Sequence, residues 1–222
     1  MNENPLSIFR VESKIRRQNI GLILSLGIIA MLLSIGFFYL GSRSNHTLIW
    51  GIEIGDEYLY DVSVFGYDNN SQVPFIGLNN TRIIVRVTDL PEIPQQLNFQ
   101  SFLANVLEIT KTDCWFENGT YFTQTWRDGI NELMSRCILP VGDFELIDSL
   151  TNGTLDNGYG SSFSEGSFYI GYHYFIVDFG HGWEGNVTLD TGVPVVTSLW
   201  DFSWHPPGEW FNYGITLTKT IS

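Results

Sequence analysis

An uncharged run of 21 residues, from Ile20 to Leu40, is the feature that most restricts how this chain folds. At about 1.5 Å per residue, a helix of this length spans roughly 30 Å, the thickness of the hydrocarbon core of a bilayer. The apolar core of a cleaved leader is shorter, about 7 to 15 residues, and ends at small residues. This run ends instead in the bulky sequence FFYLG. It therefore predicts an uncleaved transmembrane anchor over residues 20–41, with a cleaved leader as the alternative.

The charges that flank the run predict its orientation. Arg10, Lys14, Arg16 and Arg17 precede it, and only Arg43 follows closely. Basic residues stay on the cytoplasmic side of a membrane. We therefore expect a single-pass plasma-membrane protein that contacts the bilayer through residues 20–41. Residues 1–19 form its cytoplasmic tail, residues 42–49 a linker and residues 50–222 an extracellular domain.

Glycosylation sequons support this orientation, because all of them follow the anchor. An Asn-x-Ser/Thr sequon marks the surface of a secreted or extracellular domain. The alternative for individual sites is an unmodified turn, since Asn-Gly is itself a strong turn signal. The six candidate sites are Asn45, Asn69, Asn79, Asn118, Asn152 and Asn186.

The charge of the predicted extracellular part restricts its partners. Seven basic and 22 acidic residues follow the anchor, which gives this part a net charge of −15. Nucleic acids and anionic lipids are bound by clustered Lys and Arg. We therefore expect no nucleic-acid partner, and a protein or glycan at the cell surface is the partner class that remains.

Two cysteines, Cys114 and Cys137, both follow the anchor, where an oxidising environment keeps disulfides intact. A bridge between them would close a medium-sized loop and contribute about 3 kcal/mol. We therefore predict a disulfide. The alternatives are two buried thiols or a pair of metal ligands, although no nearby His or Cys completes a zinc site.

Alternating apolar and polar residues predict an antiparallel β domain, built as a sandwich or half-barrel with one or two short helices. Strands are expected at residues 57–65, 82–87, 167–179, 186–190, 193–204 and 209–220, with turns at GHGWEG (180–185) and DTG (190–192). Residues 97–110 fit a strand or a helix face, and a strand is favoured. Residues 114–126 read as a hairpin around Asn118-Gly119, residues 143–150 as a helix capped by Asp143, and residues 151–166 as a loop.

Motifs for catalysis or metal binding are not found. The chain contains no H-E-x-x-H, no C-x-x-C and no G-x-S-x-G sequence. The histidines after the anchor lie far apart, and adjacent carboxylates in an acidic chain do not identify an acid and a base. We therefore expect no catalytic residue, metal or cofactor. The histidines are His46, His173, His181 and His205.

Aromatic residues are the unusual feature of the predicted domain. Alternation in a strand places Trp200, Phe202 and Trp204 on one face, and Trp210 follows shortly after. Such a row can bind a sugar or a protein, because aromatic rings supply a large contact area at low entropic cost. The alternative, which we favour, is that this face is the core and packs against Phe211, Tyr213 or Ile215.

Several short segments resemble uncharacterised membrane-anchored surface proteins of archaea, particularly of the Asgard group. These segments are WGIEIGDEYLYDV, NGTYF, LPVGDF and TLDTGVP, and the likeness covers most of residues 50–222. The resemblance implies an extracytoplasmic β domain and assigns no functional residue. The sequence as a whole leaves three hypotheses for the function. These are a surface protein with a binding or cell-envelope role, a receptor for carbohydrate or small ligands that uses an aromatic face, and a hydrolase.

Overall fold

The computed structural model describes residues 47–68, 73–152, 158–205 and 209–220. The predicted anchor and two candidate glycosylation sites, Asn45 and Asn69, lie outside these ranges. The side chains of Asp68, His205, Glu209 and Trp210 are likewise not described. In the described part, no helix is long and apolar enough to cross a membrane.

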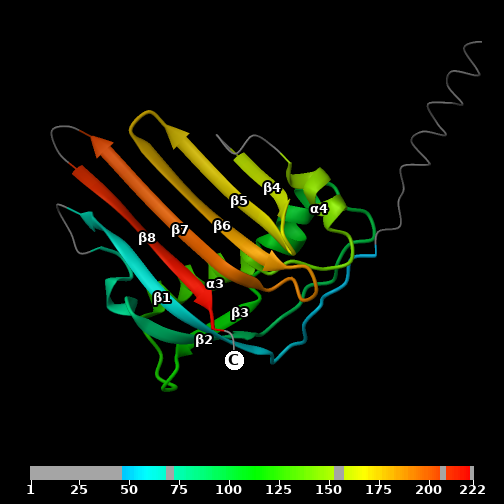
Figure 1. Ribbon diagram of the computed structural model, residues 1–222, viewed down its shortest axis with the longest axis horizontal. Coiled ribbons are helices and arrows are strands. Elements are labelled where there is room, and N and C mark those ends of the chain that lie inside the picture. Colours follow the sequence, from blue (N-terminus) through cyan, green and yellow to red (C-terminus); the bar gives the residue numbers. More distant parts are fainter. Residues whose placement is uncertain (1–46, 69–72, 153–157, 206–208, 221–222) are drawn as a thin grey trace, which may run out of the picture. The chain divides into compact units, whose positions relative to one another are not determined.

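Eight antiparallel strands form a single sheet within the described residues, as Figure 1 shows. Their order across the sheet is β3-β2-β1-β8-β7-β6-β5-β4. The predicted antiparallel, mainly β fold is therefore confirmed, whereas a sandwich of two sheets is wrong. The strands are β1 (Glu57–Asp68), β2 (Thr81–Val87), β3 (Thr112–Phe116), β4 (Gly158–Ser164), β5 (Ser167–Ile176), β6 (Phe179–Thr188), β7 (Pro194–His205) and β8 (Glu209–Lys219).

Helices cover one face of this sheet, which we call the inner face (Figure 1). The longest, α3, contacts β3 near one edge of the sheet and also β6 and β7, so the sheet curves around it. The predicted helix near residue 143 is confirmed as α4, and the Asp143 side chain accepts a hydrogen bond from the Leu146 amide at 3.0 Å. The helical segments are η1 (Ile76–Leu78), α2 (Phe99–Phe102), the π-helix η2 (Leu103–Leu107), α3 (Gln124–Cys137) and α4 (Phe144–Thr151).

The hydrophobic core lies between the inner face and the helices. In β1, Tyr60, Val62 and Val64 are buried while their neighbours in sequence point away, as the alternation predicts. The helix α3 contributes residues at helical spacing from its buried side. Its buried apolar residues are Ile130, Leu133, Met134 and Cys137.

Four predicted elements are wrong for identifiable reasons. Residues 97–110 form α2 and η2 rather than a strand, because Asn98 and Ser101 cap the helix reciprocally. The turn at Asn118-Gly119 is present, but α3 begins shortly after it and no second hairpin strand forms. The predicted turn GHGWEG lies inside β6, and the predicted loop 151–166 contains β4.

The predicted disulfide is also wrong, because both cysteines are free, buried thiols. Cys114 Sγ lies 3.8 Å from the carbonyl oxygen of Arg127, near the start of α3. Cys137, the last residue of α3, has its Sγ atom 3.0 Å from Thr197 Oγ1. Cys114 therefore lies beside Arg127, and Arg127 lies ten residues before Cys137 along the helix, a distance of about 15 Å. This exceeds the Cα separation of about 7 Å that a disulfide tolerates.

Candidate functional site

The second face of the sheet, which we call the outer face, is not covered by any helix in the described ranges (Figure 1). Trp200 and Phe202 of β7 point to this face. The residues of β7 that alternate with them, such as Thr197 and Ser203, are buried on the inner face. The structure thus places the predicted aromatic row opposite the helices.

The prediction that this row is core is therefore wrong. Trp204 is 52% exposed, and neither Trp200 nor Phe202 is fully buried. The expected packing partners lie on the inner face, because they pair with residues that alternate with the row. Ile215 pairs with Leu199 and Tyr213 with Asp201. The backbone of Trp210 in β8 pairs with Trp204. The structure does not describe the Trp210 side chain.

Trp200 and Phe202 belong to a larger cluster with His173 and Phe175 of β5, which we call the aromatic cluster. The ring centroids are 6.1 Å apart for Trp200 and Phe202, 5.2 Å for Phe175 and Trp200, and 5.3 Å for His173 and Trp200. The first two pairs have nearly parallel rings, with interplanar angles of 17° and 25°. The cluster therefore joins side chains from β5 and β7, two strands apart.

Glycines in β6 make this arrangement possible. Gly180 and Gly182 occupy the outer face of β6, between β5 and β7. A Cβ atom at Gly182 would lie 2.4 Å from the Trp200 ring, and one at Gly180 would lie 2.4 Å from the Phe202 ring. Any side chain there would push the rings away from the sheet. These glycines therefore serve close packing within a strand, which explains why GHGWEG is not a turn.

Exposed apolar residues extend the aromatic cluster toward the strand ends. Phe65 and Tyr67 of β1 share the outer face and are exposed. At the β5–β6 hairpin, Ile176 is exposed and Val177 is 96% exposed, with a φ of 29°. Positive φ is rare for a β-branched residue. Exposed apolar residues gathered in this way make the outer face a candidate interaction surface.

A polar group adjoins the aromatic cluster on the outer face. Glu184 of β6 accepts hydrogen bonds from Tyr169 Oη and Ser198 Oγ, each at 3.0 Å. His173 Nε2 lies 3.6 Å from Glu184 Oε2 and has no hydrogen-bond partner within the described residues. Burial and the charge of Glu184 raise the pKa of Tyr169, so this hydroxyl remains a donor at physiological pH. Glu184 is thus held in place beside the rings.

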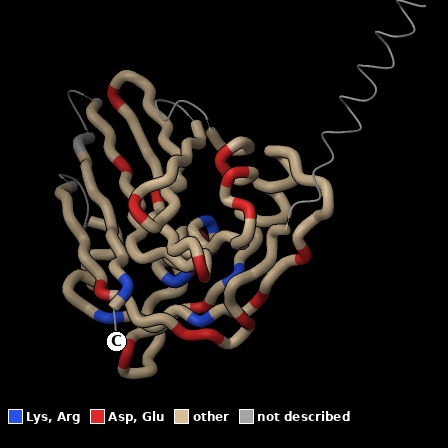
Figure 2. Tube along the Cα trace, turned by 45° about the vertical axis from the view of Figure 1, so that its right-hand side comes forward, with Lys and Arg blue, Asp and Glu red and all other residues tan. Residues whose placement is uncertain are grey.

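Basic residues are absent from this part of the sheet. The strands β5, β6 and β7 contain no Lys or Arg, and Figure 2 shows acidic but no basic positions near the tips of these strands. This part of the outer face therefore lacks the positive charge that binding of nucleic acid or acidic polymers requires. Arg82 and Arg86 share the outer face but lie on β2, toward its other edge.

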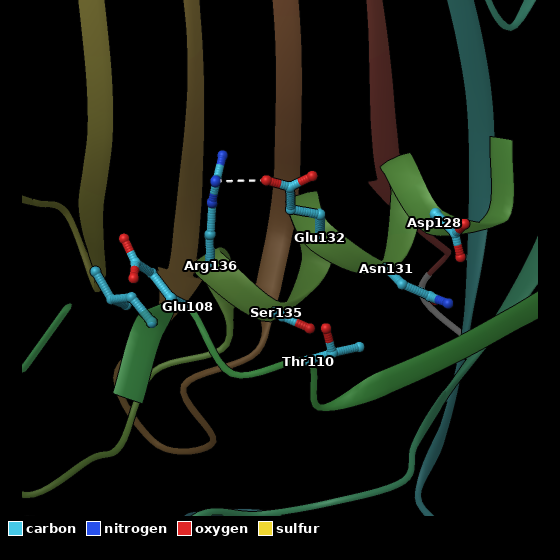
Figure 3. Close-up of a pocket in the computed structure, with 8 residues that line it drawn as sticks. Glu108, Thr110, Asp128, Asn131, Glu132, Ser135 and Arg136 are labelled. Carbon is cyan, nitrogen blue, oxygen red and sulfur yellow. Dashed lines mark ion pairs between the residues drawn. The ribbon is translucent and has the colours of Figure 1, made fainter. Parts of the chain in front are cut away.

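A separate pocket of about 310 Å³ lies between α3 and the segment after η2 (Figure 3). Glu132 and Arg136 form an ion pair there, and Asp128 accepts a hydrogen bond from Gln124 at 2.7 Å. Two of its three acids are therefore paired within α3. Throughout the described part, no group of His, Cys, Asp and Glu is suited to a metal ion. The lining residues are Leu107, Glu108, Thr110, Asp128, Asn131, Glu132, Ser135 and Arg136.

Lys111, beside this pocket, is fully buried at the end of α3. Its backbone amide donates to Ser135 Oγ at 2.8 Å, and its Nζ atom donates to the Ser135 carbonyl oxygen. Burial lowers the pKa of the Lys111 ammonium to about 7, against a small opposing effect of Cys137. The same burial raises the pKa of the Cys137 thiol to about 12.

We expect Lys111 to make the protein more stable as pH rises from about 7 to about 8.5. In this window the unfolded lysine, with a pKa of about 10.4, keeps a proton that the folded protein has released, so the free energy of unfolding rises by up to about 1.4 kcal/mol per pH unit. At higher pH the unfolded Cys137 thiol ionises while the folded one does not, which opposes the rise. Urea denaturation of wild type and Lys111→Met at several pH values tests this. If the free energy of unfolding of Lys111→Met rose with pH as much as that of the wild type, Lys111 would not be the source of the pH dependence.

The four described sequon asparagines differ in their surroundings. Asn79 is half-buried, and its Oδ1 atom accepts a hydrogen bond from the Val64 amide at 2.9 Å. Asn118 is exposed in its turn, where its Oδ1 atom accepts from the Thr120 amide at 2.9 Å. Asn152 and Asn186 are also exposed. Only Asn186 lies on a strand of the sheet.

Tyr169, Phe175 and Glu184 were not predicted as members of the site. They come together only through the pairing of β5, β6 and β7, in which the glycines of FGHGWEG lie opposite the aromatic row of β7. Comparison with models of known protein families, with curated proteins and with solved structures finds no match to this chain. The resemblance to archaeal surface proteins therefore stays a prediction.

Proposed function

We propose that this protein is an anchored, glycosylated surface receptor whose extracellular β domain binds carbohydrate on its outer face. In this proposal residues 20–41 span the plasma membrane with the N-terminus in the cytoplasm, and the curved sheet is the predicted half-barrel. The observation that carries the proposal is the aromatic cluster on a sheet face that no described helix covers.

The chemistry of the outer face supports a sugar as the ligand. A sugar ring has apolar C–H faces, which pack against aromatic rings, and hydroxyl groups at its edge. Here Trp200, Phe202 and Phe175 supply rings, and Glu184 supplies a carboxylate that is 39% exposed beside them. The absence of Lys and Arg from β5 to β7 favours a neutral sugar over an acidic one.

The aromatic cluster and the first described residues of the domain lie near opposite ends of β6. Ile49 pairs with Val141, and the neighbouring Leu139 donates to the Gly192 carbonyl oxygen in the β6–β7 turn. The aromatic cluster lies toward the other end of β6, which has 10 residues. A strand of this length spans about 33 Å. Within the described domain, the cluster is therefore remote from Ile49.

A protein partner at the cell surface is the second candidate. The exposed Ile176 and Val177 at the β5–β6 hairpin favour it, because apolar residues at a loop tip suit a protein contact better than a sugar. Both candidates use the same end of the sheet.

Protease treatment of intact cells tests the membrane topology. Cleavage is expected to remove residues beyond 50 and to spare a tag placed at Met1, because the positive flank keeps the N-terminus inside. Protection of the C-terminal domain, or a mature N-terminus near Gly41, would contradict an uncleaved anchor with this orientation.

Binding of the full chain, purified in detergent, to polysaccharides tests the proposed ligand class. We expect retention by at least one neutral polymer among cellulose, chitin, mannan and β-1,3-glucan, and none by alginate, which is acidic. Glu184→Gln keeps the shape of the side chain but removes its charge, and it should weaken binding about tenfold, since hydrogen bonds to a charged group contribute about 1.5–3 kcal/mol. Failure to bind any neutral polymer would contradict the carbohydrate proposal and favour the protein partner.

A further inference from the structure

Asn186 occupies the same face of the sheet as the aromatic cluster. In β6, residues 180, 182, 184 and 186 alternate onto the outer face, and Asn186 pairs with Tyr169 of β5. Four residues separate Asn186 from Gly182, the position over which the Trp200 ring lies. This corresponds to about 13 Å along the strand, a distance that a short oligosaccharide spans.

The Asn186 side chain is also available for modification. It is exposed and makes no hydrogen bond within the described residues, and Thr188 completes its sequon. Asn79 and Asn118 differ, because the Oδ1 atom of each accepts a hydrogen bond from a backbone amide. Asn152 is similarly exposed but follows α4, away from the strands of the outer face.

Side chains suited to a sugar continue from Asn186 to the aromatic cluster. Tyr169 lies next to Asn186, and its hydroxyl group donates to Glu184. The Tyr169 hydroxyl also lies above Gly171, where a Cβ atom would be 2.9 Å from it. Beyond Glu184 come His173 and then Trp200, whose ring centroids are 5.3 Å apart. Aromatic and hydrogen-bonding groups therefore form a continuous track from the sequon.

We propose that Asn186 carries an N-linked glycan that lies along this track and covers Trp200, so that the modification controls access to the outer face. The part of this proposal in which the glycan limits access of an external sugar to the outer face rests on the proposed carbohydrate-binding function. In the transfer, Asn186 Nδ2 forms a bond to C1 of the first sugar of a lipid phosphate-linked oligosaccharide. The bond from C1 to the phosphate oxygen breaks, the amide loses one proton, and the lipid phosphate leaves.

The test uses the full chain produced in a host that N-glycosylates extracellular domains. Peptide mass spectrometry should find a glycan on Asn186. Hydroxyl-radical footprinting should then show Trp200 protected in the wild type and exposed after enzymatic removal of the glycan or in Asn186→Gln. If the glycan covers the face for about nine-tenths of the time, its removal raises the accessible fraction, and the affinity for the external polysaccharide, about tenfold.

Asn152→Gln is the matched control, since it removes an exposed sequon away from the outer face and should leave Trp200 oxidation unchanged. Trp115 on β3 serves as the internal reference for oxidation. An unmodified Asn186, or equal Trp200 oxidation with and without the glycan, would overturn the inference while leaving the binding proposal intact. Protection of Trp200 by the glycan, without binding of any polysaccharide by any variant, would support the glycan contact and contradict the proposed function.

Discussion

Truncation of Trp183 to alanine is expected to lower the free energy of unfolding by about 3 to 5 kcal/mol, the range for a buried large aromatic residue. Trp183 belongs to the inner face of β6, is 3% exposed and packs in the main core. Its ring also contacts Tyr159, with centroids 6.0 Å apart. Removing the indole leaves a cavity beneath α3 that the curved sheet closes only in part.

Trp204→Ala is the matched change on the outer face. It should lower the free energy of unfolding by less than about 1 kcal/mol, as expected at an exposed position away from the core. Urea or thermal denaturation of both variants measures the difference. Equal losses of stability would mean that Trp204 also belongs to a packed core, contrary to its exposure. A small loss for Trp183→Ala would contradict the assignment of the inner face.

Much of the sheet could be predicted from the sequence, because alternation in β1 and β2 and the length of β7 and β8 are local signals. The helix α4 was predictable for the same reason, since Asp143 is a local cap. The helix α3 carries a clear signal too, because Ile130, Leu133, Met134 and Cys137 recur at helical spacing. It was missed because it starts without a side-chain cap at Thr123.

Other features depend on contacts between distant segments and could not be predicted. Gly180 and Gly182 resemble turn residues in sequence, and only the rings of β7 show why a strand needs them. The two cysteines are compatible with a disulfide in spacing, but the length of α3 holds them apart. Alternation showed that Trp200 and Phe202 share a face, but it does not distinguish an inner from an outer face, because that depends on where the helices pack.

The site residues on β5 and β6 likewise depend on contacts between segments and could not be predicted. Tyr169, His173 and Glu184 come together only when β5 and β6 pair in register, with Tyr169 opposite Asn186 and His173 opposite Gly182. Each is unremarkable in the linear sequence. The aromatic row of β7 was therefore identified as a candidate, and its polar neighbours were not.

Removal of the central rings should abolish most of the binding. The double variant Trp200→Ala, Phe202→Ala is expected to weaken binding of the neutral polysaccharide by at least about thirtyfold, since central aromatic residues of a binding site contribute about 2 kcal/mol or more. Tyr121→Ala is the control, because Tyr121 is an exposed aromatic residue that follows β3, away from the aromatic cluster. It should bind like the wild type.

The most direct test of the outer face as a binding face is therefore the ratio of dissociation constants for these two variants, measured with the same polysaccharide on folded, detergent-purified chain. Circular dichroism and the melting temperature establish that both variants are folded. The proposed site predicts that the cluster variant binds at least about thirtyfold more weakly than Tyr121→Ala. Equal dissociation constants for the two folded variants would show that the aromatic cluster does not bind the ligand and would contradict the account.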